Sequence, residues 1–127
     1  MKHNFIILSF LLLLLCACNK SLVSYNSDFE GTWFSTPVYN PDFQKFVSDE
    51  LVFSGKTGTY QSDCADTCST NLCECTNKIT GTAEINDSRS IIRLNGQIKR
   101  TFTVIQEPYQ QDGKWFMKLD NKVYQKQ

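Results

Sequence analysis

The sequence predicts an all-β fold, namely a small antiparallel up-and-down β-barrel of about seven or eight strands. The strongest sign is the pair Asn95-Gly96, which joins two runs rich in β-branched residues. An Asn-Gly pair in that setting favours a tight hairpin, because both turn residues accept a positive φ. Other turn signals recur about every ten residues, as in a meander. They are Ser54-Gly55, Asp87-Ser88, Asp112-Gly113 and Asp120-Asn121.

The lack of helical patterns supports the same class. No long stretch beyond residue 28 combines a helical apolar period with capping residues, so we expect at most one helical turn, near residues 41–47. A domain the size of residues 29–127 buries only ~60–65 % of its unfolded surface, and closing its sheet removes exposed edges. We therefore expect a barrel, with a half-open sandwich as the alternative.

The last predicted strands show which side chains share a face. In the run that follows Gly96, Ile98, Phe102 and Val104 lie on one face together with Arg100. In the run after Gly113, a second apolar face contains Trp115, Met117 and Leu119. Each strand should thus have one buried face and one solvent-exposed face.

The first residues predict an export leader. Lys2 and His3 precede an apolar run over residues 5–15, which is shorter than the ~20 residues of a membrane span. A basic start, an apolar run and the small Ala17 before Cys18 are typical of a secretory signal, so we expect residues 1–17 to be removed.

Leu15, Ala17 and Cys18 also resemble the lipobox of bacterial lipoproteins. The resemblance implies cleavage before Cys18, acylation of that cysteine with chains such as palmitate, and attachment to a membrane of the bacterial cell envelope. Cys16 is a poorer candidate, because the bulky Leu15 would then precede the cut. Asn19 after the lipidated cysteine favours the outer membrane, by analogy with other lipoproteins.

Residues 18–28 are expected to form a lipidated tether, since they are polar and show neither a helical nor a strand period. Ten flexible residues reach roughly 15 to 20 Å. Two or more acyl chains hold such an anchor firmly, whereas a single chain binds only marginally.

Removal of the leader changes what the composition allows. The remaining chain has twelve Lys and Arg, thirteen Asp and Glu, and no histidine. A near-neutral chain without a basic block does not fit a nucleic-acid partner. The loss of histidine excludes Ser-His-Asp and Cys-His nucleophiles and His-ligated metals, so we expect no catalytic residues, no metal site and no cofactor.

The segment Phe29-Glu-Gly-Thr-Trp33 resembles the start of lipocalins and the wider calycin group, which includes fatty-acid-binding proteins. The closing segments around Trp115 and Tyr124 are similar to those of short lipocalin-like domains in exported lipoproteins. The resemblance implies that Gly31 and Trp33 begin the first barrel strand. It also implies that the tryptophan closes one end of the barrel beneath a basic side chain of the last strand, here Lys126, with Lys122 as the alternative.

Four cysteines lie within residues 64–75, where we expect a Cys-rich hairpin. An exported chain meets oxidants, so two disulfides are predicted. We favour Cys64 with Cys75 and Cys68 with Cys73, since nearly one hairpin register serves both bridges. The crossed pairing stays open. A thiolate metal site or a redox pair is less favoured, because the spacing lacks Cys-x2-Cys knuckles.

These expectations lead to a hypothesis for residues 29–127. The domain would be a non-catalytic, lipid-anchored binding protein that holds a small apolar molecule in its barrel. The alternative is an interaction or inhibitor module that contacts another envelope protein through the Cys-rich hairpin. Carboxylates such as Asp49, Glu50 and Asp63 fit no calcium-loop spacing and are interpreted as solvated charges.

Overall fold

A computed structural model describes residues 19–65 and 76–127. It confirms the predicted class, because the chain forms a closed antiparallel barrel of eight strands. The elements in chain order are β1 (Lys20–Ser21), α2 (Leu22–Tyr25), η2 (Ser27–Phe29), β2 (Gly31–Ser35), β3 (Val38–Asn40), β4 (Lys45–Ser54), β5 (Thr57–Ala65), β6 (Thr76–Ile85), β7 (Ile91–Asn95), β8 (Lys99–Gln111), β9 (Lys114–Leu119) and β10 (Lys122–Lys126).

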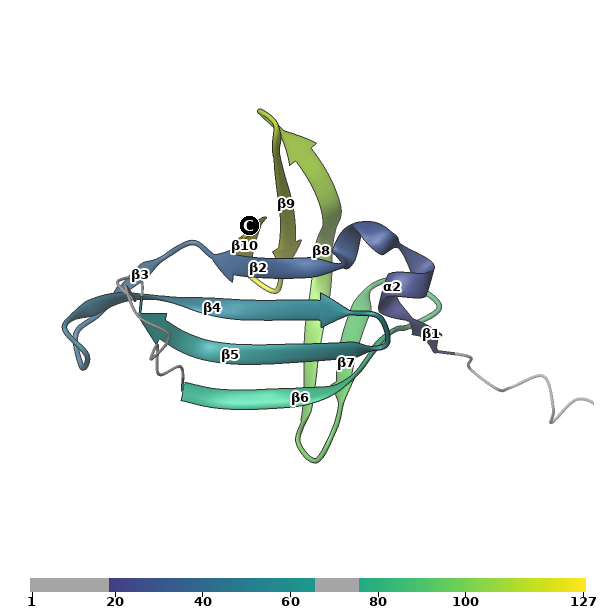
Figure 1. Ribbon diagram of the computed structural model, residues 1–127, viewed down its shortest axis with the longest axis horizontal. Helices are drawn as coiled ribbons and strands as arrows, with labels where there is room; N and C mark the ends of the chain where they lie inside the picture. The colour runs from purple at the N-terminus through teal and green to yellow at the C-terminus, as the bar shows by residue number, and fades with distance from the viewer. Residues whose placement is uncertain (1–18, 66–75) are drawn as a thin grey trace, which may run out of the picture.

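The barrel is an up-and-down meander. The pairing runs from β2 through β4, β5, β6, β7, β8 and β9 to β10, and β10 pairs with β2 to close the circuit. A half-open sandwich is therefore not formed. Figure 1 shows β4, β5 and β6 crossing β8 at a steep angle, which reflects the tilt that a small closed sheet needs. β3 extends the sheet locally by pairing with β4, and β1 adds two residues to β6.

Two of the predicted turns differ in their geometry. At the β8–β9 turn, Asp112 and Gly113 both have positive φ, 52° and 75°, as a tight hairpin requires. Between β7 and β8 the loop is longer, and Gly96 has no positive φ. Glycine is needed there because a Cβ would lie 2.0 Å from the carbonyl oxygen of Thr80 on β6.

Aromatic and aliphatic side chains fill the interior. Met117 and Leu119 are fully buried and Trp115 packs partly against the core, as their shared face predicts. Ile98 is 63 % exposed, because β8 begins only at Lys99. The largest fully buried side chains are Trp33, Tyr124, Phe29, Phe53, Phe102, Leu22, Leu51, Ile85, Ile92 and Leu94.

Residues 20–29 correct the predicted tether, because they are folded onto the barrel. Lys20 pairs with Ile85 of β6, and the side chains of Leu22 and Phe29 are fully buried. Asn26 is the N-cap of η2, and its side chain accepts a hydrogen bond from the backbone N–H of Asp28. Burial of two large apolar side chains offsets the entropy cost of ordering this segment. Its elements are too short to show a helical or strand period in the sequence.

Residues 41–47 also differ from the prediction. They form the turn of the β3–β4 hairpin and the start of β4 in place of a helical turn, with Val38 opposite Val47. Phe43 and Phe46 therefore lie on a projecting hairpin, where both are about half exposed. Within the ranges 19–65 and 76–127, no helix has the length and apolarity needed to cross a membrane.

The folded N-terminal segment can be tested by truncating Leu22. Leu22→Ala should lower the free energy of unfolding by about 2–5 kcal/mol, because it leaves a cavity in the core. The exposed Lys20→Ala should change it by less than about 0.5 kcal/mol. Urea unfolding of both variants in a chain that begins at Asn19 provides the measurement. Equal, small effects would mean that the segment is a free tether.

Candidate functional site

One end of the barrel is closed around Trp33. Its indole Nε1 donates a hydrogen bond to the carbonyl oxygen of Phe29, 2.8 Å away. The Nζ of Lys126 lies 5.1 Å from the centre of the same indole and 5.6 Å from that of Trp115, and it donates to the carbonyl oxygen of Asp28 at 2.9 Å. A cation over an indole face is attracted by the ring quadrupole. Tryptophan, lysine and the N-terminal segment thus hold this end shut.

Gly31 makes that arrangement possible. Its φ is +126°, a conformation that L side chains rarely adopt. A Cβ at this position would lie 2.7 Å from Cε of Lys126, so the aliphatic stem of the lysine crosses directly over the glycine. Gly31, Trp33 and Lys126, the three residues of the family-like motif, therefore meet in one contact. Lys122, the alternative cation, lies at the other end of β10.

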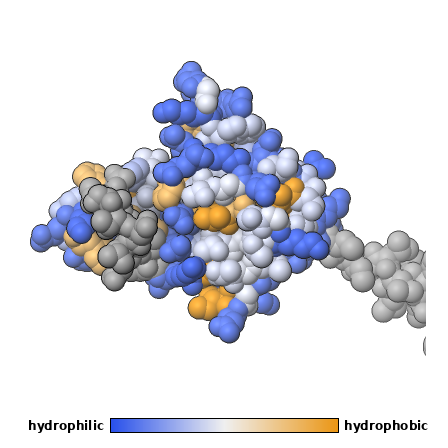
Figure 2. Space-filling view, viewed as in Figure 1, coloured by the Kyte–Doolittle hydropathy of each residue, from blue (hydrophilic) through white to orange (hydrophobic). Residues whose placement is uncertain are grey.

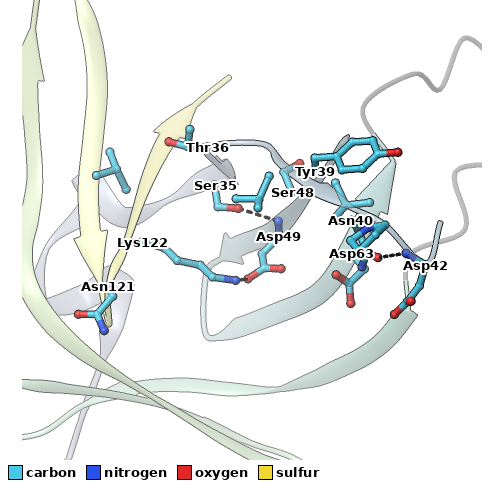
Figure 3. A pocket seen from close by; sticks show the side chains of 14 residues that line it. Ser35, Thr36, Tyr39, Asn40, Asp42, Ser48, Asp49, Asp63, Asn121 and Lys122 are labelled. Carbon is cyan, nitrogen blue, oxygen red and sulfur yellow. Dashed lines mark hydrogen bonds and ion pairs between the residues drawn. The ribbon is translucent and has the colours of Figure 1, made fainter. Parts of the chain in front are cut away.

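The barrel mouth near Lys122 contains a pocket of about 610 Å³. Its walls come from the end of β2, the β3–β4 hairpin, the end of β5 and the β9–β10 turn (Figure 3). The lining residues are Ser35, Thr36, Val38, Tyr39, Asn40, Pro41, Asp42, Val47, Ser48, Asp49, Asp63, Asn121, Lys122 and Val123.

A β-bulge lies beside the floor of this pocket. Ser48 pairs with Cys64 and Glu50 pairs with Gln61, so two residues of β5, Ser62 and Asp63, face one residue of β4. Asp63 takes the left-handed conformation with φ 54°. Bulges bend a strand and redirect side chains, and they are common at barrel rims and beside functional sites.

Asp49 is the residue opposite the bulge, and its side chain turns inward. It is only 5 % exposed because it follows the same alternation as Leu51 and Phe53. Its Oδ2 accepts hydrogen bonds from the hydroxyl of Tyr60, at 3.1 Å, and from the ammonium of Lys122, which is also its ion-pair partner. A buried carboxylate needs such partners, since losing one would leave an uncompensated charge.

The side-chain oxygen of Ser35 holds the backbone of Asp49 in place. It accepts a hydrogen bond from the Asp49 N–H at 2.8 Å, which Figure 3 shows beside the bond from Lys122. Ser35 is on β2, Tyr60 on β5 and Lys122 on β10, so three strands contact Asp49 of β4, two of them through its carboxylate.

Arg100 extends this polar cluster within the barrel. Its guanidinium carbon lies 5.3 Å from the ring centre of Tyr60 and 4.9 Å from that of Phe102, and Nη2 pairs with Asp120 at 3.4 Å. Arg100 is the charged residue that shares the predicted apolar face of β8. Stacking on two rings lets its guanidinium lie on that face while it remains partly solvated.

Burial suppresses ionisation of the tyrosines in this region. It raises the pKa of Tyr60 from 10.0 to about 12, and the Asp49 carboxylate acts in the same direction. Burial likewise raises the pKa of Tyr124. Both phenols therefore stay protonated at neutral pH and can donate hydrogen bonds, but they are poor bases.

The pocket offers hydrogen-bond acceptors and negative charge. The carboxylates of Asp42, Asp49 and Asp63 line it together with one ammonium, that of Lys122, which is paired with Asp49. The side-chain oxygen of Asn40 accepts from the backbone N–H of Asp42 at 2.9 Å and orders the rim. In the part of the chain that the structure describes, no three His, Cys, Asp or Glu side chains form a group that could hold a metal ion.

The other predicted site residues lie elsewhere. Cys64 is buried near the end of β5, next to the bulge. Cys68, Cys73 and Cys75 lie outside the described residues, as does Cys18, so the disulfide pairing and the lipidation remain predictions.

The sequence pattern alone does not bring Asp49, Tyr60 and Lys122 together as a cluster. The expectation that Asp49 is a solvated charge is wrong, because this residue is buried and stands two residues before Leu51 and four before Phe53 on the inward face of a strand. Residues two and four positions apart in a strand lie on the same face, and this alternation is the signal that identifies Asp49 as an inward-facing residue.

The contact of Lys126 with the indoles can be tested by removing only the charge. Lys126→Met keeps an aliphatic stem above Gly31 and should lower the free energy of unfolding by about 1–2 kcal/mol, through loss of the cation–π contact and of the bond to Asp28. The exposed Lys114→Met is the control and should be nearly neutral. Urea unfolding checks both, and equal effects would show that the charge does not contribute.

The raised pKa of Tyr60 predicts a loss of stability in alkali. Between pH 10 and about 12 the unfolded chain releases this phenolic proton while the folded protein keeps it. The free energy of unfolding therefore falls as the pH rises through this window, and the contribution is fully present below it. Tyr60→Phe should depend less steeply on pH there, as measured by urea unfolding at several pH values. An unchanged slope would contradict the shift.

No protein family, curated protein or solved structure matches the chain.

Proposed function

We propose that the protein is a non-catalytic binding module that takes a small ligand at the mouth of its barrel, and that a lipid on Cys18 holds it at the bacterial cell envelope. The observation that carries the binding role is the pocket of about 610 Å³ above the ordered Asp49 cluster. Clefts of this size with a few fixed polar groups are typical of small-molecule sites.

The position of the ligand follows from the packing. Fully buried side chains such as Phe53, Phe102 and Leu94 occupy the barrel interior between the two ends. An eight-stranded barrel is just wide enough for its interior to be filled in this way. Because side chains fill the interior, we propose that the ligand binds at the mouth of the barrel and not inside it.

The walls favour a ligand with an apolar body and a positively charged group. Val38, Tyr39 and Val123 supply apolar contact, and all three are more than a third exposed. Asp42 supplies a carboxylate at the rim, whereas the charge of Lys122 is already neutralised by Asp49. An organic amine can use both kinds of contact, while an anion would meet the carboxylates.

Two features support a role without catalysis. The chain after the leader has no histidine, and the phenol of Tyr60 has a raised pKa that disfavours a general base. Asp49 accepts bonds from Tyr60 and Lys122, which stabilise it as a structural anion. These groups order the floor of the pocket and leave binding to its walls.

A second candidate function is docking to another envelope protein. Val38, Tyr39, Phe43 and Phe46 on the β3–β4 hairpin are 48 to 64 % exposed, and Tyr39 and Phe46 contact each other edge to face. Figure 2 shows apolar side chains at this end of the molecule. Exposed aromatic clusters are typical of interaction sites.

The binding role can be tested with three fluorescent probes that share an apolar ring system. Dansylcadaverine carries an amine, dansylamide is neutral and dansylglycine carries a carboxylate. We expect the amine to bind most tightly and the carboxylate least, as measured by the rise in dansyl emission. Asp42→Asn should weaken binding of the amine by up to about fivefold, the value of an exposed ion pair.

Asp112→Asn is the matched control, because Asp112 lies at the tip of the β8–β9 hairpin and outside the pocket. It should bind the amine like the wild type. Phe43→Ser distinguishes the second candidate, since Phe43 is exposed on the same hairpin and does not line the pocket, and this variant should leave probe affinity unchanged. Failure of all three probes to bind, or equal effects of Asp42→Asn and Asp112→Asn, would overturn the pocket as the site.

A further inference from the structure

We infer that the end of the barrel carrying β1 rests directly on the phospholipid headgroups, with the pocket facing away from the membrane. The inference rests on the proposed lipidation of Cys18. The orientation specifies which surface of the barrel meets the bilayer and in which direction the site opens.

The first step is the firm attachment of the N-terminal segment. Directly after Asn19, Lys20 pairs with Ile85 of β6, and the Leu22 side chain is fully buried. The Tyr25 hydroxyl then donates to Glu107 of β8 at 2.6 Å. The segment is thus held by two strands of the barrel from Lys20 onward.

The chain between Cys18 and β1 is too short to let the barrel move far from a lipid on Cys18. Only Asn19 separates Cys18 from Lys20, and two residues of extended chain span at most about 7 Å. The headgroup region of one leaflet is about 5 to 8 Å thick. An acylated Cys18 at the membrane surface therefore keeps β1 within or against the headgroups, whereas a free ten-residue tether would allow the barrel to tumble.

The third step is the chemistry of the surface beside β1. Asn19 and Lys20 are exposed, as are Asp87, Ser88 and Arg89 in the turn between β6 and β7. The guanidinium of Arg89 also lies 5.1 Å from the ring centre of Tyr25, which connects this turn to the N-terminal segment. Ammonium and guanidinium groups donate charge-assisted hydrogen bonds to phosphate oxygens. This polar surface suits hydrated headgroups and not the hydrocarbon core.

The fourth step places the pocket at the opposite end. β1 pairs with the end of β6 at Ile85, while the start of β6 at Thr76 pairs with Ser62, the neighbour of the pocket residue Asp63. Ten strand residues at ~3.3 Å each separate the two ends by roughly 30 Å. Figure 1 likewise shows β1 and β3 at opposite ends of the molecule. The mouth therefore opens to the aqueous phase.

The test uses the full lipoprotein, isolated from bacterial membranes and reconstituted in vesicles of phosphatidylcholine and phosphatidylglycerol that contain a lipid with a nitroxide on its headgroup. A fluorophore is attached through an unnatural residue at Asp87, near β1, or at Lys45, on the β3–β4 hairpin. The fluorophore at position 87 should lose most of its emission, and the one at position 45 should keep most of it. Intact mass of the same sample reports the acyl chains.

The control is a variant with twelve Gly and Ser residues inserted between Asn19 and Lys20, which adds a reach of about 20 Å. The difference between positions 87 and 45 should then largely disappear. Equal quenching in an acylated wild-type protein, or a difference that the insertion leaves unchanged, would overturn the orientation while the anchor stands. A protein without acyl chains would overturn the proposed anchor and the orientation with it.

Discussion

The hydrogen bond from the Trp33 indole to the carbonyl oxygen of Phe29 joins the first barrel strand to the segment that precedes it. Lys126 adds a cation above the same indole and reaches the carbonyl oxygen of Asp28. Gly31 leaves the space that the lysine stem requires. Because this contact closes one end of the barrel, a ligand has to approach from the other end, where the pocket lies.

The same two strands serve both ends. On β2, Trp33 lies at the closed end and Ser35 reaches the mouth; on β10, Lys126 covers the indole and Lys122 pairs with Asp49. The β2–β10 register, with Lys126 opposite Trp33, therefore sets both sites at once. At the mouth, the bulge of β5 opposite Asp49 interrupts the ladder where the pocket forms. The pairing of β2 with β10 thus determines both the closed end of the barrel and the position of the residues at its mouth.

Much of the fold could be predicted from the sequence, because turn residues and strand alternation are local signals. Asp112-Gly113 and the face of Met117 and Leu119 are examples. The folding of residues 20–29 could not be predicted, since Leu22 is buried in a core built mainly from strands far along the chain. The Asp49 cluster could not be predicted for a similar reason, because its partners Tyr60 and Lys122 come from other strands. The one local signal is that Asp49 and Leu51 are two residues apart and therefore lie on the same, inward face of the strand. The predicted bridges of the Cys-rich hairpin lie mostly beyond the described residues.

We propose that a ligand binds at the open end of the barrel while the end around Trp33 stays closed. A proton–nitrogen NMR titration of the domain with dansylcadaverine tests it most directly, because it observes both ends in one experiment. We expect the amide signals of Thr36, Asp42 and Val123 to shift with probe concentration while the Trp33 indole N–H signal stays in place. A shift of the Trp33 indole signal without shifts at the mouth would contradict it.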